Sequence, residues 1–341
     1  MELQAKTNRL RVETKIQEGH WRRRFLRCPV SGEALVERGE LLRNVSGSYA
    51  YRTTESGIPL FAEKFLSIAG KVQQAHYEKI AQSYFKNLEY PHTQEYNKYL
   101  DSAFLSHLGN EECGDAAEIC CGRGEAFALL GNRVRHGVGV DVSTSMLEAA
   151  RKEQPSDRYT FVQGDATMLP LASEQFDSVF MFGGIHHVPD TDKLFSEVSR
   201  ILKPGGKFYW REPVNDLFLW RWLRALIYRV SPGLDAQTEH PLRHHEINPL
   251  LTKHGLRMDA WKTYGFLGFC FFMNSDVLIL NRLFRFIPGI RPITRSVVRF
   301  DQWSLSFPPL KNAGLQVIGC AVKSKFEQEH RRVFPCSAEV F

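Results

Sequence analysis

The chain has 341 residues, of which 43% are hydrophobic, and a formal net charge of +6. This length suffices for one large domain or two modest ones, and the apolar content can fill a core, so the composition argues against a disordered chain. Apart from residues 21–27, the basic side chains are spread out. The mild positive charge therefore permits contact with RNA or anionic lipid without arguing for it.

Cysteine usage and hydropathy bound the environment of the protein. The chain has seven cysteines, an odd number, and no two of them have the C-x-x-C spacing. This pattern argues against a disulfide framework and against a four-cysteine zinc site. The first twenty residues hold no apolar segment of the kind that a secretory signal needs. The most apolar region, residues 264–290, has no uncharged run near the ~20 residues of a spanning helix. We therefore expect no metal site and a cytoplasmic protein, with peripheral membrane contact and oligomeric state left open.

The N-terminal part of the chain divides into regions of different pattern. Residues 1–20 read as a polar tail, and residues 21–65 read as a small β-rich module because turn signals separate short strand-like runs. Helical patterns follow from residue 63 to about residue 108. We expect a larger domain over residues 66–330 and a second tail over residues 331–341.

The central part of the chain alternates strand patterns with helical patterns. Strands that alternate with helices imply right-handed crossovers and a doubly wound, mostly parallel α/β sheet of the Rossmann type. Such a sheet binds its ligand beyond the carboxyl ends of its strands. The expected strands are residues 116–120, 136–143, 159–165, 176–183 and 206–213, and the expected helices begin at residue 125 or cover residues 144–153 and 192–202.

The C-terminal part predicts a helix at residues 246–254, a strand at 256–264 and a late strand at 315–324. Between the two strands, residues 265–312 are crowded with Phe, Leu, Ile and Arg, which predicts an apolar helical insertion and a candidate lid. Residues 216–230 would be amphipathic as a helix, with Trp and Arg suited to a bilayer interface, but burial against the domain explains that pattern equally well.

A glycine-containing turn, E-I-C-C-G-R-G-E, follows the first central strand. Gly122 and Gly124 lie where strand gives way to helix, a position at which the chain turns sharply and the backbone must approach a ligand closely. A dinucleotide fingerprint would require a third small residue at position 127, where this chain has Phe127. No Gly-Lys-Ser/Thr follows either. The turn therefore predicts a nucleotide-type site that is neither a dinucleotide fingerprint nor a P-loop.

Three carboxylates lie at the ends of the first three central strands. Glu118 precedes the glycine turn, Asp141 ends the second strand, and Asp165 follows the third. Asp141 is placed to accept hydrogen bonds from both hydroxyls of a ribose, and Asp165 from an adenine amino group. Three acidic strand ends without a phosphate-binding device describe a site for a nucleoside with a cationic tail, and S-adenosylmethionine is such a ligand.

At these motifs, from Tyr77 to Pro213, the chain resembles the class I S-adenosylmethionine-dependent methyltransferases, particularly those that methylate small molecules. The glycine turn matches the first motif of that family, residues 164–180 match its adenine motif and fourth strand, and residues 185–208 match the following helix and fifth strand. Family members usually carry glycine where this chain has Cys120, whose side chain narrows the space beside the methionine moiety. The resemblance implies S-adenosylmethionine as cofactor, held by Tyr77, Glu118, Gly122, Gly124, Asp141, Met146, Asp165, Ala166 and Phe182.

The resemblance also implies a catalytic pair. Family members that methylate sugar hydroxyls use a histidine after the fourth strand and an acidic residue at the end of the fifth, and His186 and Glu212 stand at these positions. A histidine can take the hydroxyl proton, and a carboxylate can fix its tautomer. One of His186 and His187 could instead cap a helix or pack against the sheet. The cluster His240, His244 and His245 is expected to lie in a solvated loop.

The N-terminal module resembles the Trm112-like module over residues 26–61. Cys28-Pro29 and Gly57-Ile58-Pro59 match its pattern, whereas Ser31 stands where a second zinc cysteine would be. The resemblance therefore implies a degenerate module that keeps its fold without zinc.

These features together predict a methyltransferase for a small, largely apolar acceptor, with transfer to oxygen. An RNA methyltransferase is an alternative, motivated by the N-terminal module and the positive charge. Residues 183–186 argue against it and against a nucleic-acid partner, because they lack the Asn/Asp-Pro-Pro-Tyr/Phe motif of amino-directed base methylation. A non-catalytic scaffold that binds the cofactor is the second alternative, and the intact carboxylates argue against it.

Overall fold

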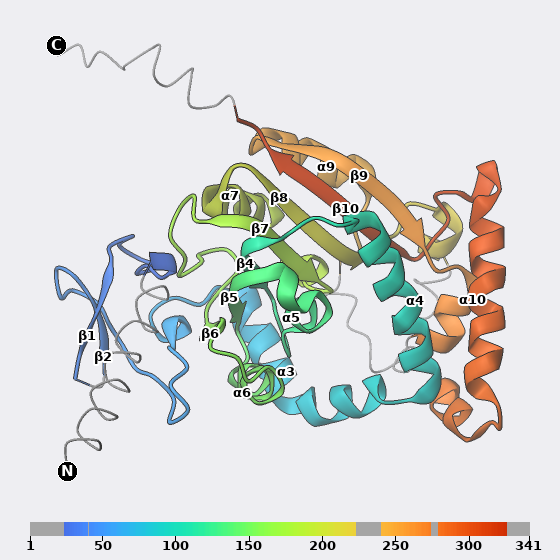
Figure 1. The fold of residues 1–341 in the computed structure, drawn as a ribbon, viewed down its shortest axis with the longest axis horizontal. Helices are drawn as coiled ribbons and strands as arrows, with labels where there is room; N and C mark the ends of the chain where they lie inside the picture. The colour runs from blue at the N-terminus through green and yellow to red at the C-terminus, as the bar shows by residue number, and fades with distance from the viewer. Residues whose placement is uncertain (1–23, 40, 223–239, 274–278, 326–341) are drawn as a thin grey trace, which may run out of the picture.

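The computed structural model describes residues 24–39, 41–222, 240–273 and 279–325. Two sheets organise them: a three-stranded sheet near the N-terminus and a seven-stranded sheet with the order β6-β5-β4-β7-β8-β10-β9. In Figure 1 the small sheet lies at one end of the molecule, and helices α4 and α10 lie at the other. The strands of the large sheet are β4 (Gly114–Ile119), β5 (Val134–Asp141), β6 (Tyr159–Gln163), β7 (Phe176–Phe182), β8 (Leu202–Pro213), β9 (Leu256–Tyr264) and β10 (Gln316–Lys323).

The topology of the large sheet confirms the predicted fold class. Strands β6, β5, β4, β7 and β8 run parallel to one another, and β10 pairs antiparallel with both β8 and β9. The strand order reverses direction at β4, whose neighbours are β5 and β7. In a doubly wound sheet, a crevice opens at this switch point beyond the carboxyl ends of the strands. The fold therefore brings the ends of β4, β5 and β7 to one site.

Helices cover both faces of this sheet (Figure 1). On one face α7 (Thr191–Ile201) buries Leu194, Phe195, Val198 and Ile201, which recur at helical spacing, in a core that it shares with α9 (His244–Lys253). On the other face the core contains apolar side chains of α4 (Pro91–Leu108), α5 (Glu125–Leu130) and α6 (Thr144–Glu153).

The region after the module, for which the sequence predicts helical structure up to about residue 108, forms two helices. Helix α3 (Ile68–Leu88) has Ser67 as its N-cap residue, whose hydroxyl accepts a hydrogen bond from the backbone N–H of Gly70. Helix α4 begins at Pro91, and proline suits the first turn of a helix because its missing N–H would have no helical partner there. The break at this proline lets α3 and α4 run in different directions (Figure 1).

The N-terminal module packs on the edge of the large sheet. It contains β1 (Leu35–Arg38), β2 (Leu41–Asn44), β3 (Ala50–Tyr51) and the short helix η1 (Phe61–Glu63). Gln163 of β6 donates its backbone N–H to the carbonyl of Pro59, and the ring of Phe25 stacks on that of Phe176 at 5.0 Å. The thiol of Cys28 lies 2.9 Å from the hydroxyl of Tyr51. The likeness of this module to Trm112, and the predicted domain boundaries, remain predictions.

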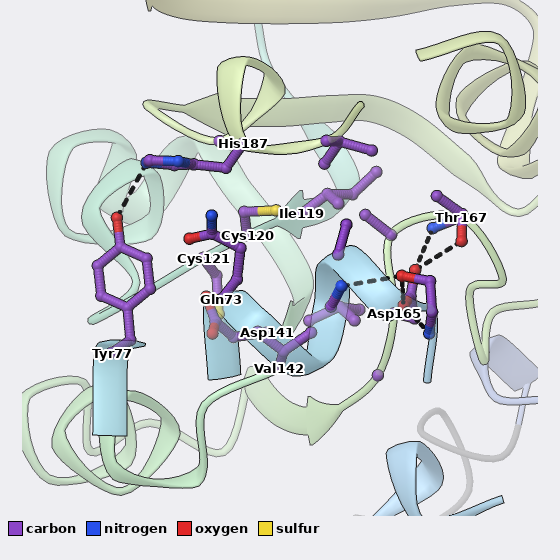
Figure 2. Close-up of a pocket in the computed structure, with 18 of the residues that line it drawn as sticks. Gln73, Tyr77, Ile119, Cys120, Cys121, Asp141, Val142, Asp165, Thr167 and His187 are labelled. Carbon is purple, nitrogen blue, oxygen red and sulfur yellow. Dashed lines mark hydrogen bonds between the residues drawn. The ribbon is translucent and has the colours of Figure 1, made fainter. Parts of the chain in front are cut away.

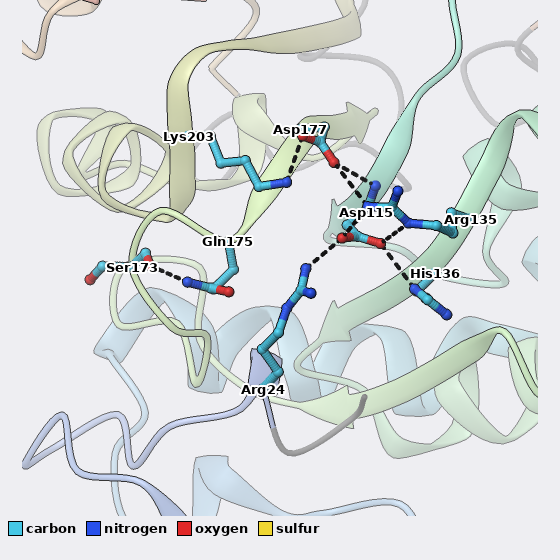
Figure 3. Close-up of polar contacts among 8 residues, drawn as sticks. All are labelled: Arg24, Asp115, Arg135, His136, Ser173, Gln175, Asp177 and Lys203. Atoms are coloured by element: carbon cyan, nitrogen blue, oxygen red, sulfur yellow. Dashed lines mark hydrogen bonds and ion pairs between the residues drawn. The ribbon is translucent and has the colours of Figure 1, made fainter. Parts of the chain in front are cut away.

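A buried carboxylate ties the module to the sheet on the side away from the strand ends described above. Asp115 is fully buried and accepts hydrogen bonds from Arg24 at 2.5 Å, Arg135 at 2.6 Å and His136 at 3.0 Å (Figure 3). Burial opposes ionisation of Asp115, but the hydrogen bonds from Arg135 and His136 outweigh it and lower its pKa to about 2. Arg24 therefore links the start of the described chain to β4.

Replacing Asp115 with asparagine is expected to lower the free energy of unfolding by about 2 kcal/mol at neutral pH, the typical worth of hydrogen bonds to a charged group. Because the folded pKa is depressed from 3.8 to about 2, the ionised carboxylate stabilises the fold above pH 4 and loses this effect as the pH falls toward 2. Urea unfolding of both proteins measures the difference between their free energies of unfolding, and this difference should become smaller by about pH 3. A difference that stays constant with pH would contradict the assignment.

The insertion after β9 is helical, as expected. It contains a π-helical turn η4 (Phe269–Met273), the 3-10 helix η5 (Ile279–Phe286), the long helix α10 (Ile290–Ser306) and η6 (Pro308–Leu310). The buried carboxylate of Asp301 anchors it by accepting hydrogen bonds from the Tyr96 hydroxyl at 2.6 Å and from the backbone N–H groups of Phe266 and Gly268. Of the amphipathic stretch 216–230, residues 223–230 lie outside the described residues. Among the described helices, none has both the length and the apolar character needed to cross a membrane.

Candidate cofactor site

A cavity of ≈ 330 Å³ opens at the carboxyl ends of β4, β5 and β7, with α3 along its side (Figure 2). The topology brings together residues that are far apart in sequence, including Tyr77 on α3 and Phe182 at the end of β7. Of the nine residues predicted to bind the cofactor, eight line this cavity: Tyr77, Glu118, Gly122, Asp141, Met146, Asp165, Ala166 and Phe182. The ninth, Gly124, is the N-cap residue of α5 and is not among the lining residues.

The glycine turn has the left-handed backbone that its sequence suggests. Gly122 has φ +50° and Gly124 has φ +76°, values that glycine adopts without a steric penalty. Phe127 is fully buried and stacks on Tyr159 with ring centroids 4.8 Å apart. A large core side chain therefore occupies the position at which a dinucleotide fingerprint has its third small residue.

Asp141 connects the end of β5 to this turn. One carboxylate oxygen accepts a hydrogen bond from the N–H of Gly122, and the other accepts one from the N–H of Ser143, each at 2.9 Å. Burial raises the pKa of the Asp141 carboxyl, and the backbone hydrogen bonds oppose that rise. The carboxylate is thus held in one orientation at the wall of the cavity.

Glu118 contacts the first turn of α5 from the end of β4. Its two oxygens accept hydrogen bonds from the N–H groups of Ala126 at 2.8 Å and Phe127 at 3.3 Å. Such N–H groups have no partner within the helix, and the helix dipole favours a negative group beside them. Burial nevertheless raises the pKa of Glu118 to about 8. A bound cation would therefore favour the ionised form of this carboxyl.

Asp165 connects the cavity to the start of α3. It accepts hydrogen bonds from the backbone N–H and hydroxyl of Ser67 at 2.9 and 2.6 Å, and from the N–H and hydroxyl of Thr167 at 2.8 and 2.6 Å (Figure 2). Ser67 is 98 residues from Asp165, and no motif in the sequence pointed to it. The beginning of α3, directly after the N-terminal module, therefore helps to fix one wall of the cavity.

The two adjacent histidines have different surroundings. His187 lines the cavity, and its Nε2 lies 3.1 Å from the hydroxyl of Tyr77 (Figure 2). His186 is not among the lining residues; its Nδ1 lies 2.8 Å from a carboxylate oxygen of Glu212. The ring centroids of the two histidines are 3.9 Å apart. The predicted pair of His186 and Glu212 is thus in contact, while the neighbouring His187 is the histidine exposed to the cavity.

Glu212 also holds the backbone of the loop after β7. It is fully buried and accepts hydrogen bonds from the N–H groups of Gly184 at 2.6 Å and Ile185 at 2.9 Å. Burial raises the pKa of Glu212 to about 7. This carboxyl therefore has a structural task whether or not it takes part in catalysis, and its catalytic role and that of His186 remain predictions.

The sequence motifs did not single out several other residues at the cavity. Among them are Ser67, Gln73 and Lys193. The histidine cluster is separate: His240, His244 and His245 are exposed and do not line the cavity, and the last two lie in the first turn of α9 rather than in a loop.

The backbone conformation of Cys120 explains why related proteins usually have glycine at this position. Its φ is +52°, in the left-handed region that costs a residue with a Cβ roughly 1–2 kcal/mol. Its side chain lies against the loop after β7, because a Cβ added to Gly184 would come within 2.5 Å of the Cys120 Cβ. Burial raises the pKa of the Cys120 and Cys121 thiols, which disfavours the thiolate form of both side chains.

Replacing Cys120 with glycine is expected to tighten S-adenosylmethionine binding by about threefold to tenfold, because it removes a side chain from the cavity wall and relieves the left-handed strain. Its effect on the free energy of unfolding should be small, since the extra backbone freedom of glycine in the unfolded chain, roughly 0.5–1 kcal/mol, offsets the relief. Titration calorimetry of both proteins measures the change. Cys120→Val is the matched control, which should bind more weakly; equal affinity of all three proteins would mean that this side chain does not limit the site.

Comparison with known proteins agrees with this geometry. Residues 117–210 match the family model described as a methyltransferase domain. A ubiquinone/menaquinone biosynthesis C-methyltransferase of Allorhizobium ampelinum is 33% identical over 135 residues, which cover 36% of this chain and 52% of the relative. A methyltransferase of Streptomyces halstedii is 36% identical over 146 residues, which cover 41% of this chain and 51% of the relative. The matched regions thus span about half the length of these curated relatives.

A solved structure shares the fold. It is a chain from the complex between the Haloferax volcanii Trm112 methyltransferase activator and a methyltransferase, with a TM-score of 0.50 and 17% sequence identity, covering 73% of this chain and 96% of that one. At this identity the likeness shows the fold alone. The strand order, the cavity at the switch point and the match over residues 117–210 agree with one another: these residues match a methyltransferase domain, and the fold and cavity fit S-adenosylmethionine as its cofactor.

Proposed function

We propose that this protein transfers a methyl group from S-adenosylmethionine to a small, largely apolar acceptor. The observation that carries the proposal is the convergence of Glu118, Asp141 and Asp165 on one cavity beside a glycine turn. Three carboxylates suit the ribose, the adenine and the cationic methionine end of this cofactor. The domain would supply proximity and in-line alignment of acceptor, methyl and sulfur, which is most of what such a transfer needs.

Two observations support an apolar acceptor. The aromatic insertion packs on α4 and β9, where Tyr99, Tyr264 and Phe269 surround the buried Tyr96. In addition, several similar proteins are named for quinone substrates, such as the demethylmenaquinone methyltransferase of Staphylococcus saprophyticus, which is 38% identical over 95 residues. A ring-bearing lipid acceptor is the chemical class that both observations favour.

We propose oxygen as the methylated atom, with His186 as the general base and Glu212 as its support. The contact of 2.8 Å between the two side chains is the arrangement that a base of this kind requires. Transfer to carbon is the second candidate, because the Allorhizobium relative is named a C-methyltransferase. For transfer to carbon, a base would remove a ring proton after the methyl transfer.

The proposal is tested by comparing the metabolites of cells with and without the gene. The expected result is a lipid-soluble compound that loses the mass of one methylene in the cells without the gene and regains it when purified protein and S-adenosylmethionine are added. A cofactor labelled with 13C in its methyl group then distinguishes an oxygen-bound from a carbon-bound methyl by chemical shift. A missing methyl found in RNA instead of a small molecule would contradict the acceptor proposed here.

A further inference from the structure

Helix α10 has an apolar face that no described part of the protein covers. Its buried side chains Ile290, Thr294 and Val298 recur every four residues and face α4. A second stripe, formed by Ile293, Phe300, Trp303 and Phe307, follows helical spacing on an adjacent side and is exposed, with Trp303 59% exposed. The rings of Phe300, Trp303 and Phe307 contact one another in sequence, with centroid distances of 5.8 and 4.8 Å.

The exposed apolar surface extends from α10 to the start of the insertion. Gly268 lies directly against α10, because a Cβ added to it would come within 2.4 Å of Val297. Val297 is on the same side of the helix as Ile293 and Phe300. On either side of this close contact, Leu267 and Phe271 are 44% and 45% exposed.

A third segment adjoins the second. Trp220 is buried, contacts the ring of Phe266 at 5.4 Å and donates its indole N–H to the carbonyl of Ala313. Its neighbours Phe218 and Trp222 are 70% and 67% exposed. Three segments from different parts of the chain thus present large apolar side chains to solvent near one another, and we call this surface the aromatic face.

Positive charge accompanies the aromatic face. Residues 265–312 contain five arginines and one lysine against two aspartates, of which Asp301 is buried, and two of the arginines, Arg291 and Arg295, pair with Glu95 of α4. Arg221 and Arg299 are exposed beside the face, next in sequence to Trp222 and Phe300. Soluble proteins rarely leave so many large apolar side chains exposed together unless the surface binds something.

We propose that the aromatic face docks on the surface of a bilayer that contains anionic lipids. Tryptophan and phenylalanine enter the headgroup region, where an amphipathic ring is stable, and arginines at the border attract acidic headgroups. Helix α10 would lie along the bilayer surface over about 25 Å, the length of its 17 residues. This inference rests on the proposed function and deepens it, since a lipid acceptor would then reach the enzyme from the bilayer.

The charge favours a bilayer over a second copy of the chain. A symmetric dimer through this face would bring the arginines of both copies close together, whereas anionic headgroups neutralise them. The aromatic face also lacks exposed acidic side chains among the described residues of the insertion, so the other copy would supply no partner for those arginines from this surface.

The test is sedimentation of the full-length protein with vesicles of phosphatidylcholine, with and without phosphatidylglycerol. We expect binding to the mixed vesicles, weaker binding to phosphatidylcholine alone, and a further loss as salt is raised. The double variant Phe300→Glu/Trp303→Glu should lower the partition coefficient by at least about tenfold. Val45→Glu is the matched control: Val45 is 59% exposed and belongs to the N-terminal module, which lies at the opposite end of the molecule from α10 (Figure 1), and its replacement should leave binding unchanged.

Vesicle binding, oligomeric state and cofactor binding together separate the outcomes. Absence of vesicle binding by the wild type, or equal binding by the double variant, would overturn the proposal, as would a dimer in solution that the double variant dissociates. Thermal unfolding of both variants verifies that they fold. Asp141→Ala separates this inference from the proposed function: a protein that binds vesicles but not S-adenosylmethionine leaves the docking intact, whereas cofactor binding without vesicle binding removes the docking alone.

Discussion

Replacement of Asp141 with alanine is expected to weaken S-adenosylmethionine binding by about 100-fold or more. Two losses combine in this variant. A ribose would lose a charged acceptor for its hydroxyls, each such bond being worth about 1.5–3 kcal/mol. The N–H groups of Gly122 and Ser143 would also lose the carboxylate that holds the glycine turn.

Titration calorimetry measures the affinity of this variant directly. Asp259→Ala is the matched control, because Asp259 is a half-exposed carboxylate on β9 that does not line the cavity, and its replacement should leave the affinity unchanged. Asp141→Asn keeps one acceptor oxygen and should fall between the two. Wild-type affinity in Asp141→Ala would mean that the cofactor does not bind at the end of β5.

Replacement of Glu212 with alanine is expected to lower the free energy of unfolding by about 3 to 5 kcal/mol, the usual cost of removing one partner from a buried charged network. The backbone N–H groups of Gly184 and Ile185 would lose their acceptor in a fully buried position, and His186 would lose its carboxylate. Urea unfolding followed by circular dichroism measures the loss.

A catalytic role is separated from this structural one by His186→Gln, which leaves Glu212 and its backbone hydrogen bonds in place. If His186 is the base, this variant should bind S-adenosylmethionine like the wild type and transfer the methyl group about 100-fold or more slowly. His187→Gln is the matched control, since it changes the histidine that faces the cavity. If His187→Gln alone loses transfer, the proton acceptor is His187 and the assignment to His186 is wrong.

The convergence of the three carboxylates could be predicted from the sequence because strand ends are a regular consequence of the fold. Glu118 and Asp141 lie at the carboxyl ends of β4 and β5, Asp165 comes shortly after β6, and parallel strands end at one edge. The sequence alone also showed that Phe127 excludes a dinucleotide fingerprint, because the third small residue of that fingerprint has a fixed position.

Contacts between distant segments could not be predicted in this way. Ser67 contacts Asp165 across 98 residues, and Tyr77 contacts His187 across 110, so neither contact has a local pattern. The sequence shows two adjacent histidines, His186 and His187. Which of the two rings faces the cavity depends on the backbone of the loop after β7, which the sequence does not give. The left-handed backbone of Cys120 could not be predicted from this sequence either, although the glycine that the family usually has at this position is consistent with such a backbone.

The insertion illustrates the same limit. Its aromatic and basic composition predicted an apolar helical segment, but the sequence could not tell which side chains α10 buries against α4 and which it leaves exposed. Asp301 decides this, because its hydrogen bonds to Tyr96, Phe266 and Gly268 fix the rotation of the helix. The aromatic face follows from that rotation.

The most direct test of the central claim is titration of the purified full-length protein with S-adenosylmethionine, with the demethylated product S-adenosylhomocysteine followed by mass spectrometry in the presence of a lipid extract. We predict saturable one-site binding, and formation of S-adenosylhomocysteine that depends on the extract. Absence of cofactor binding, in a protein whose unfolding transition shows that it is folded, would contradict the assignment of the cavity between β4, β5 and β7.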